Sequence, residues 1–549
     1  MGEIFLSPST ESPRFTARCG RRRVAVETQF VHANVKGRSL YPGTYAVTTP
    51  TKAAAVLAET GETLTYSELD ERSIRLAHAL RDNGLRRGDV VILLSENNLH
   101  AFEVYWAAVR SGLYFTAVNH SLGLEEVSFI VNASGAKALV ASAAKRDTAG
   151  GILPDVDVPL RLAFDGPIDG YCCYEDALRA ASRAPLAAQP HGRAMLYSSG
   201  TTGRPKGVQP PLPDCEVDSP ADPNVALQGK YFGVDQSTIY LSPAPLYHAA
   251  PLRWSAGIQA HGGTVVVMRK FDAQRRLETI EKYRVTHAQF VPTMFIRMLD
   301  LPDARRKAYD LSTLRAAIHA AAPCPVTVKQ RMIDFWGPIV YEYYAGTEGN
   351  GMTMIDSRDC LRKPGSVGRP LLGTIRICDD TGELLGPAEV GDVYFERDIT
   401  PFVYLNDPDK TAKSQHPQHP NWSTLGDIGY LDDDGFLFLT DRKSFTIISG
   451  GVNIYPAEIE SVLALHPAVA DVAVFGVPDA EMGEAVMAVV QPAAGAETDT
   501  LADELAGVVR SKIAPFKVPR KFDFSDQLPR SDTGKMMKAE LKHNYSNGT

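Results

Sequence analysis

The chain has 549 residues, of which 44% are hydrophobic and 22% charged, a composition typical of a globular protein with more than one domain. Its formal net charge of −8 and the absence of a long basic run argue against nucleic acid as the main partner. Seven cysteines without C-x-x-C spacing favour a reducing, cytoplasmic compartment over a structural zinc site, and no uncharged apolar run has the length of a transmembrane helix.

Residues 1–40 are predicted to be an N-terminal extension. They contain five closely spaced arginines among Ser and Thr, as transit peptides do, but also Glu3, Glu11 and Glu27, which are atypical of such peptides. We therefore expect the folded protein to begin near residue 41.

Helices alternate with wholly apolar strands from about residue 41 to 145. Thr65 and Glu68 have the spacing of a capping box, and apolar residues recur after them at helical spacing. A second helix is predicted from about 100 to 110. Apolar runs predict strands at 90–94, 112–118 and 138–141. This alternation indicates a parallel sheet with helices on both faces.

The second half of the chain repeats this class of structure. Residues 209–234 are rich in Pro, Asp and Asn and are predicted to be a long loop. Strands are then predicted near 263–268, 286–291, 315–319 and 339–344. We expect two doubly wound α/β halves and, over 365–441, a small antiparallel β-barrel, because short β-rich segments there alternate with Asp/Gly turns.

A smaller unit is predicted after Arg442. Its expected elements are a helix near 456–465, strands near 471–476 and 485–491, and a helix near 501–513. The predicted organisation is therefore a large domain over 41–442 and a small, mobile α+β domain over 443–549.

Residues 195–208, Met-Leu-Tyr-Ser-Ser-Gly-Thr-Thr-Gly-Arg-Pro-Lys-Gly-Val, are predicted to bind a polyphosphate. Glycines let backbone N–H groups converge on an anion, hydroxyls add donors, and a lysine adds a compact positive charge. The segment is not a Walker A loop, because Pro205 stands at the second glycine position and Gly207, predicted to close the turn, stands where Ser or Thr is needed. The candidate phosphate-binding residues are Ser198, Ser199, Gly200, Thr201, Thr202, Gly203 and Lys206.

The order YSSGTTGRPKGV resembles the phosphate loop of the adenylate-forming superfamily, which includes acyl-CoA ligases, firefly-type luciferases and peptide-synthetase adenylation domains. Further stretches resemble that family in the same order: 320–323, 341–348, 424–427, 441–451 and 528–535. Together they span the chain from about residue 195 to 538.

The resemblance implies roles for residues of the nucleotide site. Tyr344 would stack on adenine, Thr347 would bond a phosphate oxygen, and Glu348 would hold Mg²⁺. A carboxylate beside a triphosphate is repelled unless such a cation bridges the two. The small residues Ala320, Ala321 and Ala322 would let the backbone approach the base. Ala345 replaces the family's usual glycine.

Further roles follow from the same resemblance. Asp427 would accept hydrogen bonds from the ribose hydroxyls, with Leu425 inserted in the motif, and Arg442 would lie near the ribose. Ser444 occupies the hinge position, where the family usually has Asp or Lys. Gly450 and Gly451 would line a pantetheine tunnel. Lys535 would be the catalytic lysine that bridges the substrate carboxylate and the α-phosphate.

The acyl substrate is the least determined part of the site. His248 ends a segment that resembles the family's aromatic segment beside the carboxylate, so we expect it to position or gate the acyl group. A predicted apolar wall comprises Trp254, Gly257, Val291, Met294, Phe295 and Ala322.

The resemblance implies an ATP-dependent acyl-CoA ligase that activates a hydrophobic carboxylic acid, fatty, aryl or steroidal, through an acyl-AMP intermediate. ATP, Mg²⁺ and coenzyme A would be used, by a monomer or homodimer without a transmembrane segment; peripheral membrane contact is left open. Only fourteen residues follow Lys535, which favours free CoA over a fused carrier domain. The alternatives are transfer to an amine, a carrier protein or, as in a luciferase, oxygen, and a non-catalytic nucleotide-binding homologue.

Overall fold

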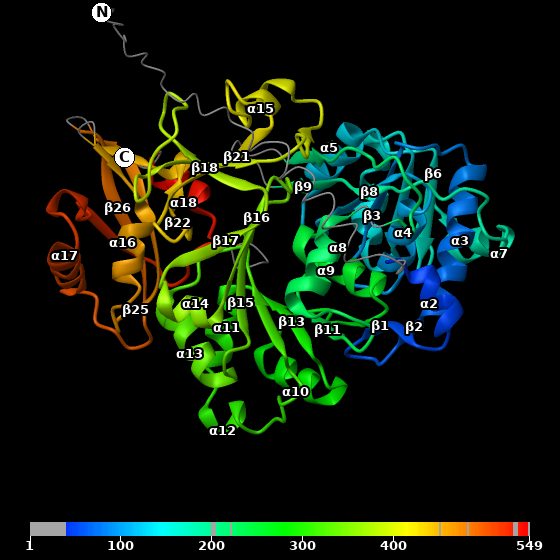
Figure 1. Cartoon of the computed structure of the whole chain (residues 1–549), viewed down its shortest axis with the longest axis horizontal. Coiled ribbons are helices and arrows are strands. Elements are labelled where there is room, and N and C mark those ends of the chain that lie inside the picture. Colours follow the sequence, from blue (N-terminus) through cyan, green and yellow to red (C-terminus); the bar gives the residue numbers. More distant parts are fainter. Residues whose placement is uncertain are drawn as a thin grey trace, which may run out of the picture.

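The computed structural model describes residues 40–198, 205–219, 222–449, 452–479, 482–530 and 536–546. Two α/β units, one of them continued by antiparallel strands, lie beside a smaller C-terminal unit (Figure 1). The two predicted α/β halves are confirmed.

The first sheet has six strands, all parallel, in the order β7-β6-β5-β3-β4-β8. Every residue of β3, β4 and β5 is buried, as the apolar runs predict. Val91 and Leu93 pack with residues of α3 and α4, whereas Ile92 and Leu94 pack with residues of α5 and α6, so helices cover both faces. The bounds are β3 Val90–Leu94, β4 Tyr114–Val118, β5 Ala138–Ser142, β6 Leu160–Phe164, β7 Cys172–Cys173, β8 Arg193–Ala194, α3 Tyr66–Asp82, α4 His100–Val109, α5 Leu124–Ser134, α6 Arg146–Gly151 and α7 Tyr174–Ala180.

The second sheet has thirteen strands, in the order β18-β19-β21-β22-β17-β16-β15-β14-β13-β11-β12-β1-β2. Along this order, each strand from β15 to β1 pairs in parallel with the next. Its strand β1 precedes the first sheet in sequence but pairs with β12, so the start of the chain belongs to the second half. The bounds are β1 Ala53–Leu57, β2 Thr63–Thr65, β11 Ile239–Ser242, β12 Thr264–Val267, β13 His287–Phe290, β14 Ala316–His319, β15 Val340–Ala345, β16 Met352–Asp356 and β17 Ser366–Leu372.

Helices cover both faces of this sheet as well. Tyr240 and Ile318 pack in one core cluster with residues of α9. The same cluster contains residues of α3, α4 and the first sheet. Leu241 and Ala317 belong to a cluster with α10, α11 and α13. The bounds are α2 Pro42–Thr48, α8 Pro223–Phe232, α9 Ala249–Ala260, α10 Ala273–Tyr283, α11 Pro292–Leu299, α12 Asp303–Arg306, α13 Val326–Trp336 and α14 Ser357–Arg362.

Helix α8 corrects the predicted loop over 209–234. Asp222 caps it by accepting a hydrogen bond from the Asn224 backbone N–H at 2.9 Å, Pro223 occupies its first turn, and Gly233 ends it at a φ of 67°. Proline just inside a helix and glycine just after it are helix boundary signals. The composition of this segment predicts a loop, whereas the positions of Asp222, Pro223 and Gly233 are those of helix boundaries.

The antiparallel unit predicted over 365–441 is present, but its strands extend the central sheet as an open path through β17 and do not close on themselves as a separate barrel. The bounds are β18 Thr374–Cys378, β19 Gly391–Glu396, β21 Trp422–Leu431, β22 Leu437–Arg442 and α15 Pro408–Lys413. A separate small sheet joins β9 Leu196–Ser198, β10 Lys206–Gln209 and β20 Val403–Tyr404.

The C-terminal unit has the predicted helices and strands. The bounds are β23 Ile447–Ser449, β24 Val452–Ile454, α16 Pro456–Leu463, β25 Val469–Asp479, β26 Gly483–Pro492, α17 Leu501–Lys512, β27 Lys521–Phe524 and α18 Lys538–Ser546. Its central pair, β25 and β26, is antiparallel, and β27 adds to β26 in parallel.

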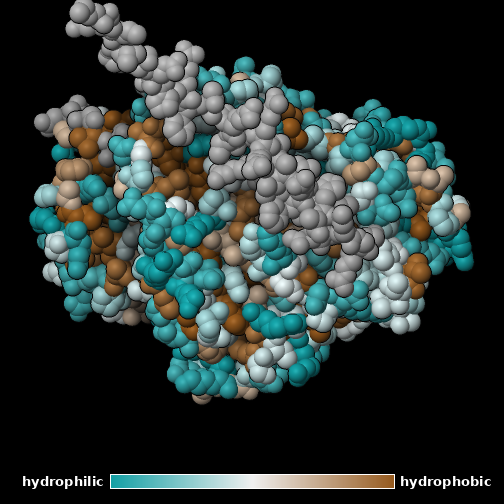
Figure 2. Space-filling model, viewed as in Figure 1, coloured by the Kyte–Doolittle hydropathy of each residue, from teal (hydrophilic) through white to brown (hydrophobic). Residues whose placement is uncertain are grey.

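None of the helices in the described ranges is long and apolar enough to cross a membrane. On the face seen in Figure 2, hydrophobic residues are interspersed with hydrophilic ones.

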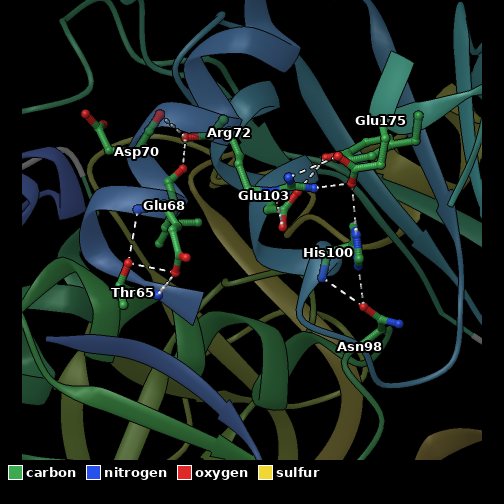
Figure 3. Close-up of polar contacts among 11 residues, drawn as sticks. Thr65, Glu68, Asp70, Arg72, Asn98, His100, Glu103 and Glu175 are labelled. Carbon is green, nitrogen blue, oxygen red and sulfur yellow. Dashed lines mark hydrogen bonds and ion pairs between the residues drawn. The ribbon is translucent and has the colours of Figure 1, made fainter. Parts of the chain in front are cut away.

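A partly buried ionic network joins α3, α4 and α7 (Figure 3). Arg72 contacts Glu103 at 2.9 Å and Glu175 at 2.5 Å, and the Tyr174 hydroxyl donates to Glu103 at 2.9 Å. Burial raises the pKa of Tyr174, and the Glu103 carboxylate adds to this. At the start of α3, Thr65 and Glu68 form the predicted capping box.

Arg72→Met should lower the free energy of unfolding by about 2–3 kcal/mol, because Glu103 is only 3% exposed and would lose its cation. Urea denaturation measures the change. The matched control is Arg179→Met on α7, whose ion pair with Asp176 is exposed and should contribute less than about 0.5 kcal/mol. Equal effects of the two substitutions would contradict this account.

Candidate functional site

The predicted phosphate loop joins two paired strands. Ser198 of β9 lies opposite Lys206 of β10. The loop residues Ser199, Gly200, Thr201, Thr202 and Gly203 lie outside the described residues. Lys206 is thus placed at the start of β10, directly after the loop.

The position of Gly207 differs from the prediction that it closes the turn of the phosphate loop. It lies within β10 opposite Tyr197. A Cβ atom there would lie 3.1 Å from both the Leu405 Cβ and the Tyr197 Cζ. Glycine is therefore favoured here by the close approach of neighbouring side chains and not by a turn.

Lys206 and Glu348 meet at the ring of Tyr404. Strand β20 pairs with β10 and brings the centroid of this ring to 5.1 Å from the Lys206 Nζ. The Tyr404 hydroxyl donates to the Glu348 Oε1 at 2.9 Å. Burial lowers the pKa of Lys206, and Lys410 lowers it further, whereas Glu348 opposes the shift. The structure thus brings together the predicted phosphate-binding lysine and the predicted metal ligand.

Asp427 connects the other predicted nucleotide-binding residues. It is only 5% exposed; its Oδ2 accepts from the Tyr344 hydroxyl at 2.5 Å and its Oδ1 from the Arg442 Nε at 3.0 Å. Asp427 of β21 and Arg442 of β22 are cross-strand partners, and Tyr344 comes from β15. Each carboxylate oxygen has two acceptor sites, so acceptor capacity remains for two further donors.

The electrostatics of this cluster follow from burial. Burial raises the pKa of Tyr344, and the Asp427 charge raises it further. For Arg442, burial acts to lower the pKa, but the charge and hydrogen bond of Asp427 together with the charges of Tyr344 and Glu348 outweigh this, and the net shift is upward. At neutral pH, Tyr344 is therefore a hydrogen-bond donor and Arg442 a fixed cation.

The segment Ala320–Ala322 follows β14. Ala320 is buried, whereas Ala321 is exposed and has a φ of 77°, a left-handed conformation that non-glycine residues seldom adopt. A side chain of minimal size keeps the approach to this backbone open. Leu425, the inserted residue, lies over Gly346, where a Cβ would approach its Cδ1 to 2.7 Å.

Thr347 has a partner that the sequence analysis missed. The Arg253 Nη2 donates to the Thr347 backbone oxygen at 2.9 Å. Burial lowers the pKa of Arg253, and the Glu348 charge opposes this shift. Arg253 lies on α9, the helix that begins directly after His248. The sequence signal for Arg253 was its proximity to His248. This segment was predicted to contribute an apolar wall, and that prediction gave a charged residue no role.

The predicted apolar wall does not form a single surface. Trp254 is buried against the rings of Phe232, Tyr240 and Tyr343. Val291, Met294 and Phe295 belong to the core cluster on the other face of the sheet. These side chains thus pack in two separate core clusters. His248 is half-buried, and its ring centroid lies 4.3 Å from that of Tyr247.

The remaining predicted residues are Gly450, Gly451 and Lys535, which lie outside the described residues. The hinge position falls in the short 3₁₀ turn Lys443–Phe445. Within the described parts of the chain, no three His, Cys, Asp or Glu side chains form a metal-binding group. A single carboxylate, Glu348, fits Mg²⁺ that takes its other ligands from phosphate and water.

Asp427→Asn should weaken the binding of both AMP and ATP by about 10- to 100-fold, because it removes the charge that orients Arg442 and Tyr344. Isothermal titration calorimetry measures both affinities. Asp433→Asn is the matched control, since Asp433 is exposed in the turn of the same β21–β22 hairpin. Unchanged affinities in the Asp427 variant would remove this residue from the nucleotide site.

Comparison with known proteins agrees with this geometry. A model described as AMP-binding enzyme matches residues 44–401, and one described as AMP-binding enzyme C-terminal domain matches residues 458–535. The chain is 32% identical to a feruloyl-CoA synthase from Amycolatopsis sp., over 90% of this chain and 96% of the relative. It is also 32% identical to the fatty acid–[acyl-carrier-protein] ligase ScoC of Streptomyces coeruleorubidus, over 89% and 93%.

The fold has solved counterparts as well. The structure of the amide bond synthetase McbA from Marinactinospora thermotolerans superposes with a TM-score of 0.80, at 28% identity, covering 92% of this chain and 99% of McbA. The names of these similar proteins differ: one is a CoA synthase, one an acyl-carrier-protein ligase and one an amide bond synthetase.

Proposed function

Because the chain belongs to the AMP-binding, or adenylate-forming, enzyme family, we propose that it is an ATP-dependent acyl-CoA ligase that activates a hydrophobic carboxylic acid. The substrate carboxylate attacks the α-phosphorus of ATP, which forms acyl-AMP and releases pyrophosphate. The thiol of coenzyme A then attacks the acyl carbon, and AMP leaves.

The observation that carries this proposal is the pair of linked clusters around Tyr404 and Asp427. Lys206 and Glu348 meet at Tyr404, and Tyr344 and Arg442 meet at Asp427. The first cluster offers a cation and a carboxylate, as a metal-bound polyphosphate requires, and the second offers a buried acceptor for hydroxyls. Phosphoryl transfer depends mainly on such positioning and charge neutralisation.

Each residue then has a defined task. Lys206 offsets the negative charge of the phosphates, and Asp427, oriented by Arg442 and Tyr344, accepts from the ribose. Glu348 would hold Mg²⁺, which when bound neutralises the charge of the departing pyrophosphate. Lys535 would bring the substrate carboxylate and the α-phosphate together against their mutual repulsion.

The acceptor is proposed to be coenzyme A, with an amine or a carrier protein as the second candidate. The feruloyl-CoA synthase supports the first, and McbA and ScoC support the second. A non-catalytic nucleotide sensor is disfavoured, because Lys206, Glu348, Asp427 and Lys535 are all present in the chain.

Pyrophosphate release with a panel of fatty, aryl and steroidal acids tests the proposal. We expect turnover with at least one hydrophobic acid and a product that forms only when coenzyme A is added. Separate reactions with amines and with acyl carrier protein serve as controls. Product formation in those reactions but not with coenzyme A would refute the proposed acceptor, and no pyrophosphate with any acid would refute the activity.

Lys535→Ala should lower the rate of ATP–pyrophosphate exchange by a factor of about 10² or more, yet leave most thioester formation from supplied acyl-AMP intact. The reason is that the lysine is needed only where the carboxylate meets the α-phosphate. Both half-reactions are measured on the same preparation. A comparable loss in both would show that Lys535 serves the whole fold or both steps.

A further inference from the structure

Lys410 is a second lysine beside the predicted phosphate-binding residue, on an element that the predicted loop does not include. It lies in the first turn of α15, whose cap Asp407 accepts from the Lys410 backbone N–H at 3.0 Å. The next residue, Thr411, accepts from the Tyr404 backbone N–H at 2.9 Å. The first turn of α15 is therefore fixed to the strand that carries Tyr404.

Two ammonium groups thus lie at a single aromatic ring. The Lys206 Nζ is 5.1 Å and the Lys410 Nζ 5.9 Å from the centroid of Tyr404. Across the described chain, no carboxylate comes within 4 Å of either ammonium; Glu348 acts on Lys206 from farther away and is itself bonded to the Tyr404 hydroxyl.

This arrangement is unfavourable without an anion. Lys206 is half-buried; burial lowers its pKa, and the nearby Lys410 and Arg442 charges lower it further. Like charges held together in a partly desolvated site repel each other, and a ring face compensates only in part. A multiply charged anion that contacts both lysines would remove the repulsion.

The position of the lysines indicates which part of a nucleotide this anion is. Asp427, with Tyr344 and Arg442, forms the end suited to the ribose. Lys206 and Lys410 lie at Tyr404, whose hydroxyl orients Glu348, the predicted ligand of a phosphate-bound cation. The two ammonium groups therefore belong to the polyphosphate end of the site.

We propose that Lys410 is a second phosphate-binding residue, which with Lys206 holds the β- and γ-phosphates of ATP and the pyrophosphate product. The inference rests on the proposed use of ATP. It assigns Lys410 to the first half-reaction and gives it no part in binding AMP or in transfer to the acceptor.

Lys410→Ala tests the assignment, with binding measured calorimetrically in the absence of any acid. The probes are α,β-methylene-ATP, inorganic pyrophosphate and AMP, the first two with Mg²⁺. We expect the affinity for the first two to fall about 10-fold, the size of one charge-assisted hydrogen bond, and the affinity for AMP to change less than about 2-fold.

Two controls accompany this variant. Lys413→Ala removes an exposed lysine from the same helix and should leave all three affinities unchanged. Lys410→Arg keeps the charge and should keep most of the affinity for pyrophosphate. Because only the backbone of Lys410 is used in the helix cap, the thermal unfolding of Lys410→Ala should match that of the wild type.

The outcomes separate the two proposals. Wild-type affinity of Lys410→Ala for pyrophosphate and the ATP analogue, or an equal loss for AMP, would overturn the role of Lys410. A wild-type protein that binds neither AMP nor the analogue would overturn the proposed function and this inference with it.

Discussion

The pairing of β10 with β20 is the constraint on which the polyphosphate end of the site depends. It joins two segments nearly two hundred residues apart and places the Tyr404 ring between Lys206 and Glu348. A lysine and a carboxylate without this spacer would form an ion pair, and the charges would cancel. The hydroxyl of Tyr404 holds Glu348, and its ring face receives the cations, so both charges remain available to a ligand.

A similar principle governs the ribose end. Asp427 is buried, which would be costly for an isolated carboxylate, but it is paired with one cation and one neutral donor from two other strands. Its charge is thereby stabilised before any ligand arrives. A preorganised acceptor of this kind needs little rearrangement when hydroxyl groups bind to it.

Local and periodic features were predictable from the sequence. The capping box at Thr65, the buried strands such as Val90–Leu94 and the elements of the C-terminal unit all lie where periodicity places them. Long-range pairings were not predictable, because no local pattern reports them. The sequence does not show that β1 joins the second sheet, or that the antiparallel strands after β17 continue it.

The same division applies to the site. Motif residues such as Tyr344, Glu348 and Asp427 could be identified singly, and their roles toward ligands remain predictions. Their contacts with one another, and the neighbours Tyr404, Lys410 and Arg253, depend on tertiary structure. Gly207 illustrates what the sequence cannot distinguish. Both a turn and close packing favour glycine, and only the atoms around Gly207 in the structure show which of the two applies.

The junction between the large and small units is also set by a carboxylate. The Oδ1 of Asp441 accepts from the Arg442 backbone N–H at 2.7 Å, and its Oδ2 accepts from the Ala457 N–H, at the start of α16, at 2.8 Å. Lys443 binds Asp392 at 2.7 Å and Asp380 at 3.2 Å. Both anchored residues, Asp441 and Lys443, thus precede the hinge position in the chain. Any rotation there that carries α16 away from β22 must break the Asp441 bond and expose the first turn of the helix. The cost of domain movement would therefore reside in the contacts of Asp441 and Lys443, which precede Ser444, and not in Ser444 itself.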